Sequence, residues 1–518
     1  MEMDNSYYVG LDFGTCNLKA VSYVHGKNRI IKLNKDQNGK AYAPSIILYD
    51  KNKNGEIEKK IGMRAKKNPD ELNKVHNIKK KLELKDWSKF IQNLGHDVDA
   101  PTVCQDIFTR IYNIIMENRP DTASIITTIT VPVAFSEVQR RVIWTAAKTA
   151  GFDVRYLITE SFAALFSQED LFGDEEGEEN VMIFDFGGAT LDLSLIHIEN
   201  DGNGGIDVTE LSSVGMRFGG LDIDQLIYEE ILKKKYPQEI EAALLADDIG
   251  IAEQELMEAA AHIKEIIFAE DAEEETEYTI PVRGCKSINV IVSQAEILDV
   301  FEQKGLAKKV GKLIDELFDA QDDVNPDEVT RVYPFGGSSM IAYFRKILDE
   351  KIDVFDMDDC EIDDDLYLAI AKGASTYTYF RENNENFTMK QSIPFLVGLL
   401  KDDAFSYILP KATPGYISTR RPLSWEWLGE HNDSVDLYQT FSNERELQGK
   451  SITEDSAFIT YIGSFYLDRS KYDLSITPTY NMFFDRAGNL VIRTWQQMPE
   501  DDEPVQREEL MIKMGVQP

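Results

Sequence analysis

Two aspartates in this chain are each followed directly by a glycine-containing turn, in DFGT (residues 12–15) and in DFGGAT (residues 185–190). Backbone N–H groups of such turns can approach a phosphate, and a carboxylate beside them can hold hydrated Mg²⁺ or orient water. A third turn, GGS (residues 336–338), precedes a helical pattern, where backbone amides and the helix dipole also favour an anion. Each turn alone is weak evidence, because glycine turns occur in every fold. The three together predict a site for a phosphate-bearing ligand and Mg²⁺.

The elements that must position these turns can be predicted from the hydrophobic pattern around them. Ser136 and Gly151 stand where a helix would begin and end around the pattern SEVQRRVIWTAAKTAG. We expect strands over residues 7–12, 124–133, 181–185 and 191–196, a strand-to-helix junction over 332–338, and helices within 221–268. Strands that end in tight glycine turns, with helices between them, predict an α/β architecture.

A polar, aperiodic stretch near residues 382–391 precedes a region of different character. Short, alternating, aromatic segments follow and predict a compact antiparallel β-domain, in which Trp425 and Trp427 fill the core or line a peptide groove. These segments cover residues 417–425, 434–441, 458–467, 475–484 and 489–495. We therefore expect domains at 1–385 and 392–498, a short linker at 386–391, and an acidic tail at 499–518 that is frayed or forms one short helix.

The composition limits the classes of partner. Of 518 residues, 43% are hydrophobic and 28% charged, as in ordinary globular proteins, and the formal net charge is -36. Such a charge repels phosphate backbones and anionic lipids, so we expect neither a nucleic-acid nor a membrane partner. No run of the sequence approaches the ~18 apolar residues that would span a bilayer.

The cysteines and histidines point to no metal or disulfide framework. Cys16, Cys104, Cys285 and Cys360 are far apart and form no CxxC pair. This spacing argues against a structural zinc site and favours a reducing compartment. The six histidines show no metal-ligand spacing. We therefore expect a cytoplasmic protein.

The motifs resemble, in their order along the chain, those of the superfamily that contains actin, hexokinase and the heat-shock ATPases. YYVGLDFGTCNLKAVSY resembles its first phosphate motif, VMIFDFGGATLDLSL its second, and VYPFGGSSMI its adenosine motif. The strongest resemblance is to the 70-kDa heat-shock (DnaK-type) chaperones, because VPVAFSEVQRRVIWTAAKTAGFDVRYLITESFAALFS is similar to their connecting segment. It covers roughly residues 6–380, and SIPFLVGLL and ITPTYNMFFDRAGNLVI resemble their substrate-binding β-sandwich more weakly.

The resemblance implies an actin-like ATPase domain, with two lobes around a nucleotide cleft, followed by a small β-sandwich without the helical lid of full-length relatives. The implied ligands are ATP or ADP with Mg²⁺. Asp12 and Asp185 would position Mg²⁺ and its waters, Glu160 would place the attacking water, and Thr190 would bond the γ-phosphate. Further nucleotide contacts are implied for Gly14, Thr15, Cys16, Gly187, Gly188, Gly219, Gly220, Lys264, Gly336, Gly337 and Ser338.

The resemblance also implies a catalytic lysine and a coupling device. The lysine lies in HNIKKKLEL, where we prefer Lys80 and keep Lys79 as the alternative register; the run could also be a solvated basic face. Pro132 and Arg140 keep the spacing of the family's proline switch and relay arginine, although packing explains a proline at a strand end equally well.

Some positions depart from the family's pattern. Cys16 replaces a threonine and Ala189 replaces the third glycine of the second phosphate motif. The family holds adenine between two arginines, where this sequence has Glu265 and Met340, with Phe268 in place of a serine. Both cationic planes for the base are therefore replaced. Either Met340 and Phe268 form an apolar slot, or the nucleotide binds weakly or not at all.

Three functions remain open. The first is a chaperone that binds and slowly hydrolyses MgATP and holds an extended peptide or a dedicated protein partner with its β-domain, with or without co-chaperones. The second is a scaffold or regulatory protein that keeps the fold and turns over little or no nucleotide. The third is an actin-like filament protein, against which the β-domain argues. In the linker, NFTMKQ offers only Phe387 and Met389 where relatives carry leucines, so the usual coupling between domains is not expected.

Overall fold

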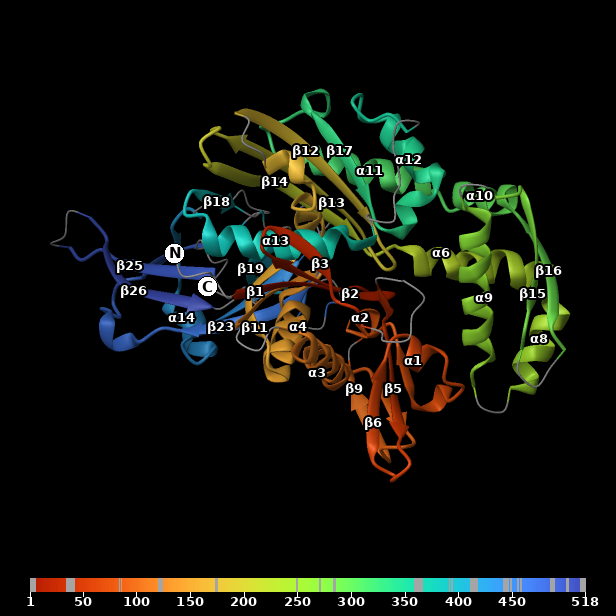
Figure 1. The fold of residues 1–518 in the computed structure, drawn as a ribbon. Coiled ribbons are helices and arrows are strands. Elements are labelled where there is room, and N and C mark those ends of the chain that lie inside the picture. The colour runs from red at the N-terminus through yellow and green to blue at the C-terminus, as the bar shows by residue number, and fades with distance from the viewer. Residues whose placement is uncertain are drawn as a thin grey trace.

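The computed structural model shows the arrangement of the helices and strands for most of the chain (Figure 1). It describes residues 6–33, 42–82, 84, 86–119, 124–172, 176–247, 250–269, 272–282, 286–357, 367–390, 392, 395–409, 418–440, 447, 450–453, 456, 459–484, 490–499 and 503–512. Cys285, Cys360, Gln391 of the expected linker, and residues 500–502 and 513–518 of the expected tail lie outside the described residues. Within these ranges, no helix is both long enough and apolar enough to cross a membrane.

The N-terminal part begins with a mixed sheet in the order β11-β10-β1-β2-β3, with β4 paired to β2. Its strands are β1 (Ser6–Phe13), β2 (Asn17–Val24), β3 (Lys27–Ile30), β4 (Ala43–Pro44), β10 (Ser124–Val131) and β11 (Asp153–Thr159). β1 runs parallel to β10 and antiparallel to β2, so the β1–β2 hairpin carries the first glycine turn. Helices α3 (Ala100–Asn118) and α4 (Glu137–Ala150) cover one face of this sheet and share a buried core with it (Figure 1).

A second mixed sheet, in the order β17-β12-β13-β14-β18, carries the other two turns. Its strands are β12 (Gly177–Phe186), β13 (Leu191–Asn200), β14 (Ile206–Met216), β17 (Arg331–Phe335) and β18 (Phe387–Lys390). β12 is antiparallel to β13 and parallel to β17. The turns that follow β12 and β17 therefore lie at the same end of the sheet, beyond the carboxyl ends of these two strands. The predicted strands of the N-terminal part are therefore confirmed, within one to four residues at their ends.

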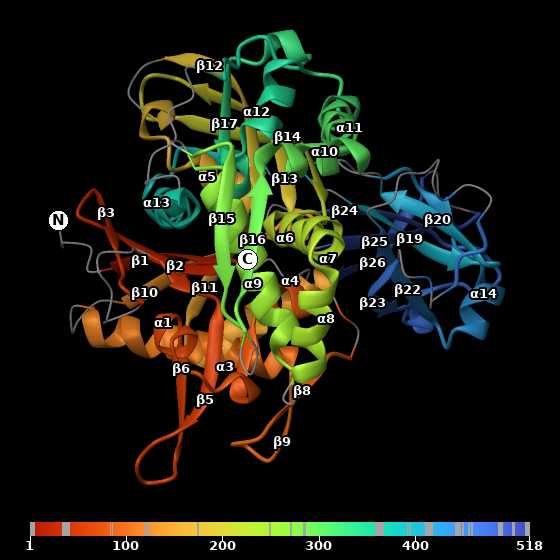
Figure 2. The same ribbon diagram turned by 90° about the vertical axis from the view of Figure 1, so that its right-hand side faces the viewer.

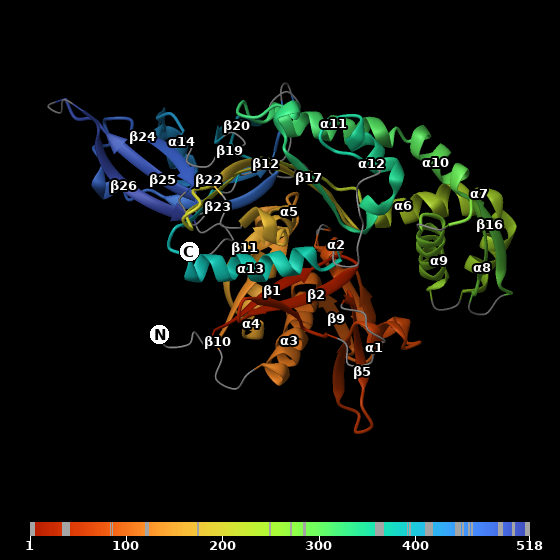
Figure 3. The same ribbon diagram turned by 45° about the horizontal axis from the view of Figure 1, so that its top comes forward.

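Helices α5 (Glu160–Leu165) and α13 (Ala369–Asn383) lie between the two sheets (Figure 3). The ring centroids of Phe162 in α5 and Tyr377 in α13 are 6.4 Å apart, and both residues belong to a buried cluster with Ile183 of β12. On the other side, the Thr378 hydroxyl lies 2.7 Å from the hydroxyl of Thr128 in β10. These two helices therefore join the sheets whose turns form the candidate site.

Smaller units extend outward from each sheet and face one another (Figure 2). The first contains β5 (Ile46–Lys51), β6 (Ile57–Ile61), α1 (Met63–Lys66), η1 (Glu71–Asn73), β7 (Lys74–His76), α2 (Ile78–Lys81), β8 (Ser88–Ile91) and β9 (His96–Asp99). The second contains α6 (Gly220–Leu226), the π-helix η3 (Ile227–Leu232), α7 (Lys233–Lys235), α8 (Pro237–Ala246), α9 (Ala252–Ile267), β15 (Glu275–Ile280), β16 (Ile288–Ser293) and α10 (Gln294–Gln303). Gln254 of α9 joins the units by donating to Glu71 Oε2 at 3.1 Å.

The remaining helices of the N-terminal part support the second sheet. They are η2 (Glu169–Phe172), α11 (Leu306–Asp319), η4 (Pro326–Glu328), η5 (Gly337–Met340) and α12 (Ala342–Asp349). The helix predicted around SEVQRRVIWTAAKTAG is α4, and both of its predicted ends are confirmed. The Ser136 hydroxyl accepts from the Gln139 N–H, and Gly151 ends the helix with a left-handed φ of 108°.

The C-terminal part consists of antiparallel strands, as predicted. Its sheets have the orders β20-β19-β22-β23 and β21-β24-β25-β26, and residues of both contribute to one buried cluster. The strands are β19 (Leu396–Lys401), β20 (Ala404–Leu409), β21 (Arg421–Pro422), β22 (Ser434–Thr440), β23 (Thr460–Tyr466), β24 (Thr479–Phe484), β25 (Leu490–Gln496) and β26 (Val505–Ile512). The Trp425 and Trp427 side chains pack against the shared cluster.

Two expectations for this part were wrong. The segment 417–425 was expected as one strand, but only Arg421–Pro422 pairs, and the helix α14 (Trp425–Glu430) follows. The region beyond residue 498 was expected as a frayed tail or a short helix, but it contains β26, which pairs with β25 along its whole length. Leu510 and Ile512 of this strand pack against the shared core cluster, as suits an edge strand with one face on the core. The C-terminal β-structure therefore extends to Ile512.

The expected linker is also a strand. β18 pairs in parallel with β14, with Phe387 opposite Ile206. Just beyond it, the backbone N–H and the hydroxyl of Ser392 both donate to Glu210 Oε2 at 3.0 Å. The C-terminal strands also contact the N-terminal part directly, because Arg141 of α4 donates to the Ile462 carbonyl at 3.1 Å. Among the described residues of this connection, Phe387–Lys390 and Ser392 are thus held by hydrogen bonds to the second sheet.

Candidate functional site

The two hairpins that carry the first and second turns have the same design. In the β1–β2 hairpin, Asp12 lies directly opposite Lys19, and in the β12–β13 hairpin, Asp185 lies directly opposite Asp192. Each aspartate stands one residue before its strand ends, so the chain turns immediately beyond it. The pairing register therefore directs the carboxylates and the glycine turns to the same end of their sheets.

The turns lie close enough that side chains are excluded between them. A Cβ on Gly188 would lie 2.5 Å from Cys16 Sγ, so only glycine allows the first and second turns to approach in this way. Gly336 has a φ of 83°, and a Cβ there would lie 2.8 Å from Asp185 Oδ1. The turn after β17 therefore closes directly over the Asp185 carboxylate.

A fourth turn, formed by Gly219 and Gly220 at the start of α6, joins the second and third turns. The Gly220 N–H and the Ser338 hydroxyl both donate to the Gly187 carbonyl at 3.0 Å. Lys264 of α9 donates to the Gly220 carbonyl at 2.9 Å and pairs with Asp224 at 2.6 Å. The residues that the sequence implied as nucleotide contacts, from segments far apart in the chain, are thus brought together around these turns.

Buried charges gather where the turns meet. The carboxyl groups of Asp12, Glu160, Asp185 and Asp192 and the ammonium group of Lys79 belong to residues that are at most 8% exposed. Lys79 forms an ion pair with Glu160. Both oxygens of Asp185 are buried and accept no hydrogen bond from any described residue. Because an unpaired buried carboxylate is costly, this site calls for a cation or for protons.

The pKa shifts agree with a site in which carboxyl groups outnumber the ammonium groups of Lys79 and Lys19. Burial, followed by the neighbouring Glu160 carboxylate, raises the pKa of Asp185 well above its ordinary value. Burial likewise raises the pKa of Asp192 to about 7 and raises the pKa of Glu160. Burial also raises the pKa of Cys16 to about 11, which keeps this thiol neutral beside the turn. These carboxyl groups retain protons more readily than ordinary ones unless a cation joins them.

The site fits Mg²⁺ held together with phosphates. No group of three or more His, Cys, Asp or Glu side chains in the described part of the chain lies close enough to hold a metal ion alone. Mg²⁺ needs no such group, because it usually takes one or two carboxylates and completes its shell with water and phosphate oxygens. The unpaired Asp185 oxygens are suited to this role, with Thr15 and Thr190 buried in the adjacent turns.

The structure favours Lys79 over Lys80 as the lysine of this site. Lys79 is buried and pairs with Glu160, whereas the Lys80 side chain is 36% exposed and pairs with Asp222 at 2.9 Å. Asp222 in turn accepts from the Gly219 N–H at 2.9 Å. Lys80 thus joins α2 to the start of α6 and lies outside the cluster of buried carboxylates, so the alternative register is the one that the geometry supports.

Pro132 and Arg140, the implied coupling residues, are in contact. The buried Arg140 guanidinium donates to the carbonyls of Pro132 at 3.4 Å, Val133 at 3.4 Å and Phe135 at 3.2 Å. This arginine therefore fixes the turn that follows β10. Whether it relays anything between domains stays a prediction.

The part of the site where the resemblance places the adenine base, here called the base end, contains different chemistry. It comprises Met340, Tyr367, Phe268 and Glu265. Met340 closes η5, and the Tyr367 hydroxyl donates to its sulfur at 3.1 Å. The Tyr367 ring stacks on Tyr42, with centroids 5.8 Å apart. The Phe268 ring is stacked with Phe301 of the neighbouring core, and the Glu265 side chain is 73% exposed. An apolar and aromatic surface around Met340 thus stands where the resemblance implied an arginine.

Sequence reasoning missed several residues of the site. Lys19 pairs with Asp12 Oδ2 at 2.7 Å, and Asp12 holds the pKa of Lys19 above its ordinary value against the lowering effect of burial. Asp192 and Tyr367 were also missed. A charged residue inside an otherwise apolar strand, as Lys19 is in NLKAVSYV, was the available signal, because such a residue must find a partner.

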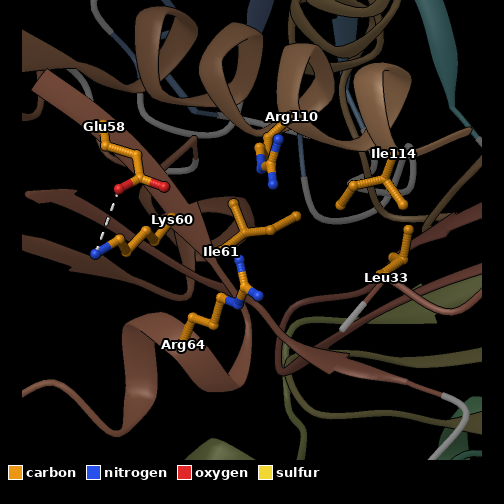
Figure 4. Close-up of a pocket in the computed structure, with 7 residues that line it drawn as sticks. All are labelled: Leu33, Glu58, Lys60, Ile61, Arg64, Arg110 and Ile114. Carbon is orange, nitrogen blue, oxygen red and sulfur yellow. Dashed lines mark ion pairs between the residues drawn. The ribbon is translucent and has the colours of Figure 1, made fainter. Parts of the chain in front are cut away.

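Two pockets in the described part of the chain lie away from the turns. One small cavity of about 20 Å³ lies beside β6 and α3, and its lining residues come from none of the turns (Figure 4). It is lined by Leu33, Glu58, Lys60, Ile61, Arg64, Arg110 and Ile114. A larger hollow of about 390 Å³ adjoins β18 and also contains none of the turn residues. The chemistry of the turns, rather than the size of a cavity, therefore identifies the candidate site.

Comparison with known proteins places this site within one long match. The family model described as Hsp70 protein matches residues 8–398. A chaperone protein HscA homolog from Janthinobacterium sp. (strain Marseille) is 26% identical over 411 residues, which cover 76% of this chain and 62% of the relative. A chaperone protein DnaK from Mycoplasmoides gallisepticum is 28% identical over 369 residues, which cover 68% of this chain and 57% of the relative. The matches thus span less than two thirds of these curated relatives.

Proposed function

This chain belongs to the Hsp70 protein family, and from that premise we propose that residues 1–385 bind MgATP and hydrolyse it slowly to ADP and phosphate. Family membership carries an actin-like ATPase fold and a chaperone-like, ATP-binding function. The observation that supports nucleotide chemistry best is the unpaired, buried carboxylate of Asp185 at the meeting point of the glycine turns. Such a group is costly in the protein alone and useful once a cation and phosphates are bound.

The proposed chemistry uses positioning and charge rather than a covalent nucleophile. Mg²⁺, when bound beside Asp12 and Asp185, supplies positive charge that offsets the charge on the phosphates. Backbone N–H groups of the turns and the hydroxyls of Thr15 and Thr190 donate to phosphate oxygens. These donors are held in place by strands and by hydrogen bonds between the turns, so little reorganisation is needed when the phosphates bind.

Glu160 is the proposed residue that orients the attacking water. It stands at the first position of α5, and its ion pair with Lys79 fixes its side chain. Lys79 also adds positive charge near the phosphates, which is the role that the sequence implied for a lysine of this segment. Burial raises the pKa of Glu160, and the adjacent Lys79 ammonium opposes this effect.

We further propose two lobes around a nucleotide cleft in residues 1–385, and a β-sandwich from residue 392 that extends through β26. The β-sandwich holds an extended peptide or a dedicated protein partner, in the cytoplasm and with or without co-chaperones. The relatives that match most of this chain are named chaperones, which supports the proposal. The linker strand β18 and the contact between Ser392 and Glu210 provide a route by which the two parts could influence one another.

A second candidate function is a scaffold that keeps the fold and turns over little nucleotide. The base end supports it, since Met340 and Glu265 stand where the resemblance implied two arginines. Without those cations, stacking and cation–π attraction to adenine are reduced. The glycine turns and the buried charges around Asp185, here called the phosphate end, argue for the first function over this one. A site without a ligand gains nothing from an unpaired carboxylate.

Calorimetric titration of the full chain with MgATP, MgADP and magnesium triphosphate tests both functions. Micromolar or tighter binding of MgATP supports the ATPase proposal. Binding of triphosphate with equal or greater affinity than MgATP would show that the phosphate end works while the base end adds nothing. No heat with any of the three, from a protein whose folding is confirmed by circular dichroism, would contradict the ATPase proposal and leave the scaffold.

A further inference from the structure

Lys19 is a buried cation at the phosphate end that none of the proposed roles uses. It is the third residue of β2, directly opposite Asp12, and its ammonium is 2.7 Å from Asp12 Oδ2. The side chain is 13% exposed and that of Asp12 is 3% exposed. A direct ion pair therefore occupies one of the two aspartates that are proposed to position Mg²⁺.

The strand around Lys19 offers no other reason for a lysine. The Lys19 side chain is largely buried, so an unpaired ammonium at this position would be strongly unfavourable. Besides Asp12, the carboxylates of Asp185 and Glu160 also act electrostatically on Lys19. The ammonium is thus held by the same carboxylates that surround the expected position of the metal and the phosphates.

The charges of the cluster are shared unequally. Among the described residues of the cluster, Glu160 is paired with Lys79 and Asp12 with Lys19, while both oxygens of Asp185 remain without a hydrogen bond. An ammonium has three donors and no acceptor, so Lys19 can contact Asp12 and still donate to a phosphate oxygen. Part of the positive charge that phosphates require is therefore built into the chain itself.

We propose that Lys19 is a second phosphate-binding cation, which takes over part of the role of Mg²⁺ beside Asp12. The ligands are nucleoside diphosphates and triphosphates, and their binding depends only weakly on Mg²⁺. This inference rests on the proposed nucleotide-binding function and adds a residue to it. Mg²⁺ then acts mainly through Asp185, whose oxygens are available, and a charge-assisted contact from Lys19 holds the phosphates when the metal is removed.

The first test compares ADP affinity in millimolar Mg²⁺ and in EDTA by calorimetry on the full chain. The wild-type chain is expected to lose less than about tenfold in affinity when Mg²⁺ is removed, whereas Lys19→Gln loses about 10- to 100-fold, as expected for a hydrogen bond to a charged group. Lys19→Arg keeps the charge and is expected to restore most of the binding in EDTA. Equal affinities of wild-type and Lys19→Gln in EDTA would overturn the proposal.

A matched control removes a lysine charge elsewhere. Lys60 pairs with Asp50 at 2.6 Å and also with Glu58, and Figure 4 shows the second of these pairs. Lys60→Gln has the same change in charge as Lys19→Gln and is expected to leave both affinities unchanged. A similar loss in both variants would assign the effect to overall charge and would contradict a specific role for Lys19.

The second test needs no nucleotide and separates this inference from the proposed function. Lys19→Gln leaves the Asp12 carboxylate buried without its cation, so the melting temperature in EDTA is expected to fall and millimolar Mg²⁺ to restore part of it. The melting temperature of the wild-type chain should respond much less to Mg²⁺. If no chain binds nucleotide, the proposed function fails, and this readout alone decides whether Lys19 occupies a cation position.

A charge-neutral double variant guards against a folding failure. Asp12→Asn with Lys19→Gln removes both members of the ion pair and leaves neither charge buried alone. It is expected to fold, to bind ADP in Mg²⁺ through Asp185 more weakly than the wild-type chain, and to lose measurable binding in EDTA. Binding in EDTA at the wild-type level by this variant would overturn the proposal.

Discussion

The phosphate end and the base end of the candidate site are built in different ways. The phosphate end consists of glycine turns held by strand register and by hydrogen bonds between backbone groups, with buried charges around Asp185. The base end consists of side chains, among which Met340 contacts Tyr367 and Glu265 points to solvent. The backbone donors of the phosphate end can be changed only by changing the fold, whereas the contacts of the base end change with single side-chain substitutions. Phosphate binding is therefore the firmer part of the proposal.

The largest effect is expected from Asp185→Asn, which would break the phosphate end. Removing this carboxylate charge is expected to lower MgATP turnover about 100- to 1000-fold, the range seen when one preorganised electrostatic group is lost. The variant should fold, because the amide replaces a carboxylate that accepts no hydrogen bond from any described residue. Steady-state release of phosphate measures the effect. Unchanged turnover would mean that any hydrolysis takes place away from Asp185.

A second large effect should separate Lys79 from Lys80. Lys79→Met leaves Glu160 buried without its cation, so we expect about a 100-fold loss of turnover and a loss of about 3–5 kcal/mol in the free energy of unfolding. Lys80→Met removes a partly exposed pair with Asp222 and should change either quantity little. Phosphate release and urea denaturation of both variants provide the comparison. A greater loss of turnover in Lys80→Met would restore the register that the sequence first suggested.

A smaller effect, in the opposite direction, is expected at the base end. Met340→Arg introduces one cationic plane and should raise MgATP affinity about 2- to 30-fold, as expected for a contact worth about 0.5–2 kcal/mol. Affinity for magnesium triphosphate, which has no base, should not change. Calorimetry with the two ligands measures the difference. Equal gains for both ligands would indicate a general charge effect and would remove the distinction between the two ends.

The smallest effect on the nucleotide is expected from Glu210→Gln, in the polar chain that joins the phosphate end to the linker. Ser161, next to Glu160, lies 2.7 Å from Ser194, which donates to Glu210 Oε1 at 2.8 Å. Glu210 also accepts from Ser392. MgATP affinity should change less than about twofold. Unlike Asp185, none of the four side chains in this polar network lies against a glycine of the turns.

The same variant should change the pH dependence of stability. Burial raises the pKa of Glu210 to about 7 from an ordinary value of 4.5, so between these values the folded state binds more protons than the unfolded state. The contribution of Glu210 to the free energy of unfolding is therefore fully present below pH 4.5. It falls by about 3 kcal/mol as the pH rises to about 7. Glu210→Gln should remove this slope, and Ser392→Ala should retain most of it. An unchanged slope in Glu210→Gln, measured by urea denaturation at several pH values, would contradict the assignment.

Local signals predicted much of the fold. The ends of α4 follow from Ser136 and Gly151, because capping is decided by the residues themselves. The positions of the three glycine turns follow from the strands before them. The register of Lys79 and Lys80 could not be predicted, because both lie in the four-residue helix α2 and only packing against the rest of the protein decides which side chain is buried. β26 was missed because its run of charged residues, Arg507, Glu508 and Glu509, resembles that of a tail, although Glu508 is buried.

The candidate site likewise contains residues that local patterns predict and residues that only the tertiary structure reveals. Asp12 and Asp185 were predicted because a carboxylate followed by glycines has a recognisable pattern. Lys19 was missed, since its importance depends on the antiparallel pairing that places it opposite Asp12. Tyr367 was missed because its contact with Met340 joins segments that have no shared pattern. Contacts between distant segments are set by the tertiary structure, so they could not be predicted from local patterns in the sequence.

The pairing of β18 with β14 has a practical consequence for work on the separate parts of the chain. β18 covers the outer edge of β14, and a sheet edge without a partner offers its N–H and C=O groups to other molecules. A shortened protein that ends at residue 385 would expose this edge and should aggregate more readily. One that ends after Lys390 would keep the edge covered, and it is the better starting point for crystallisation of the N-terminal part.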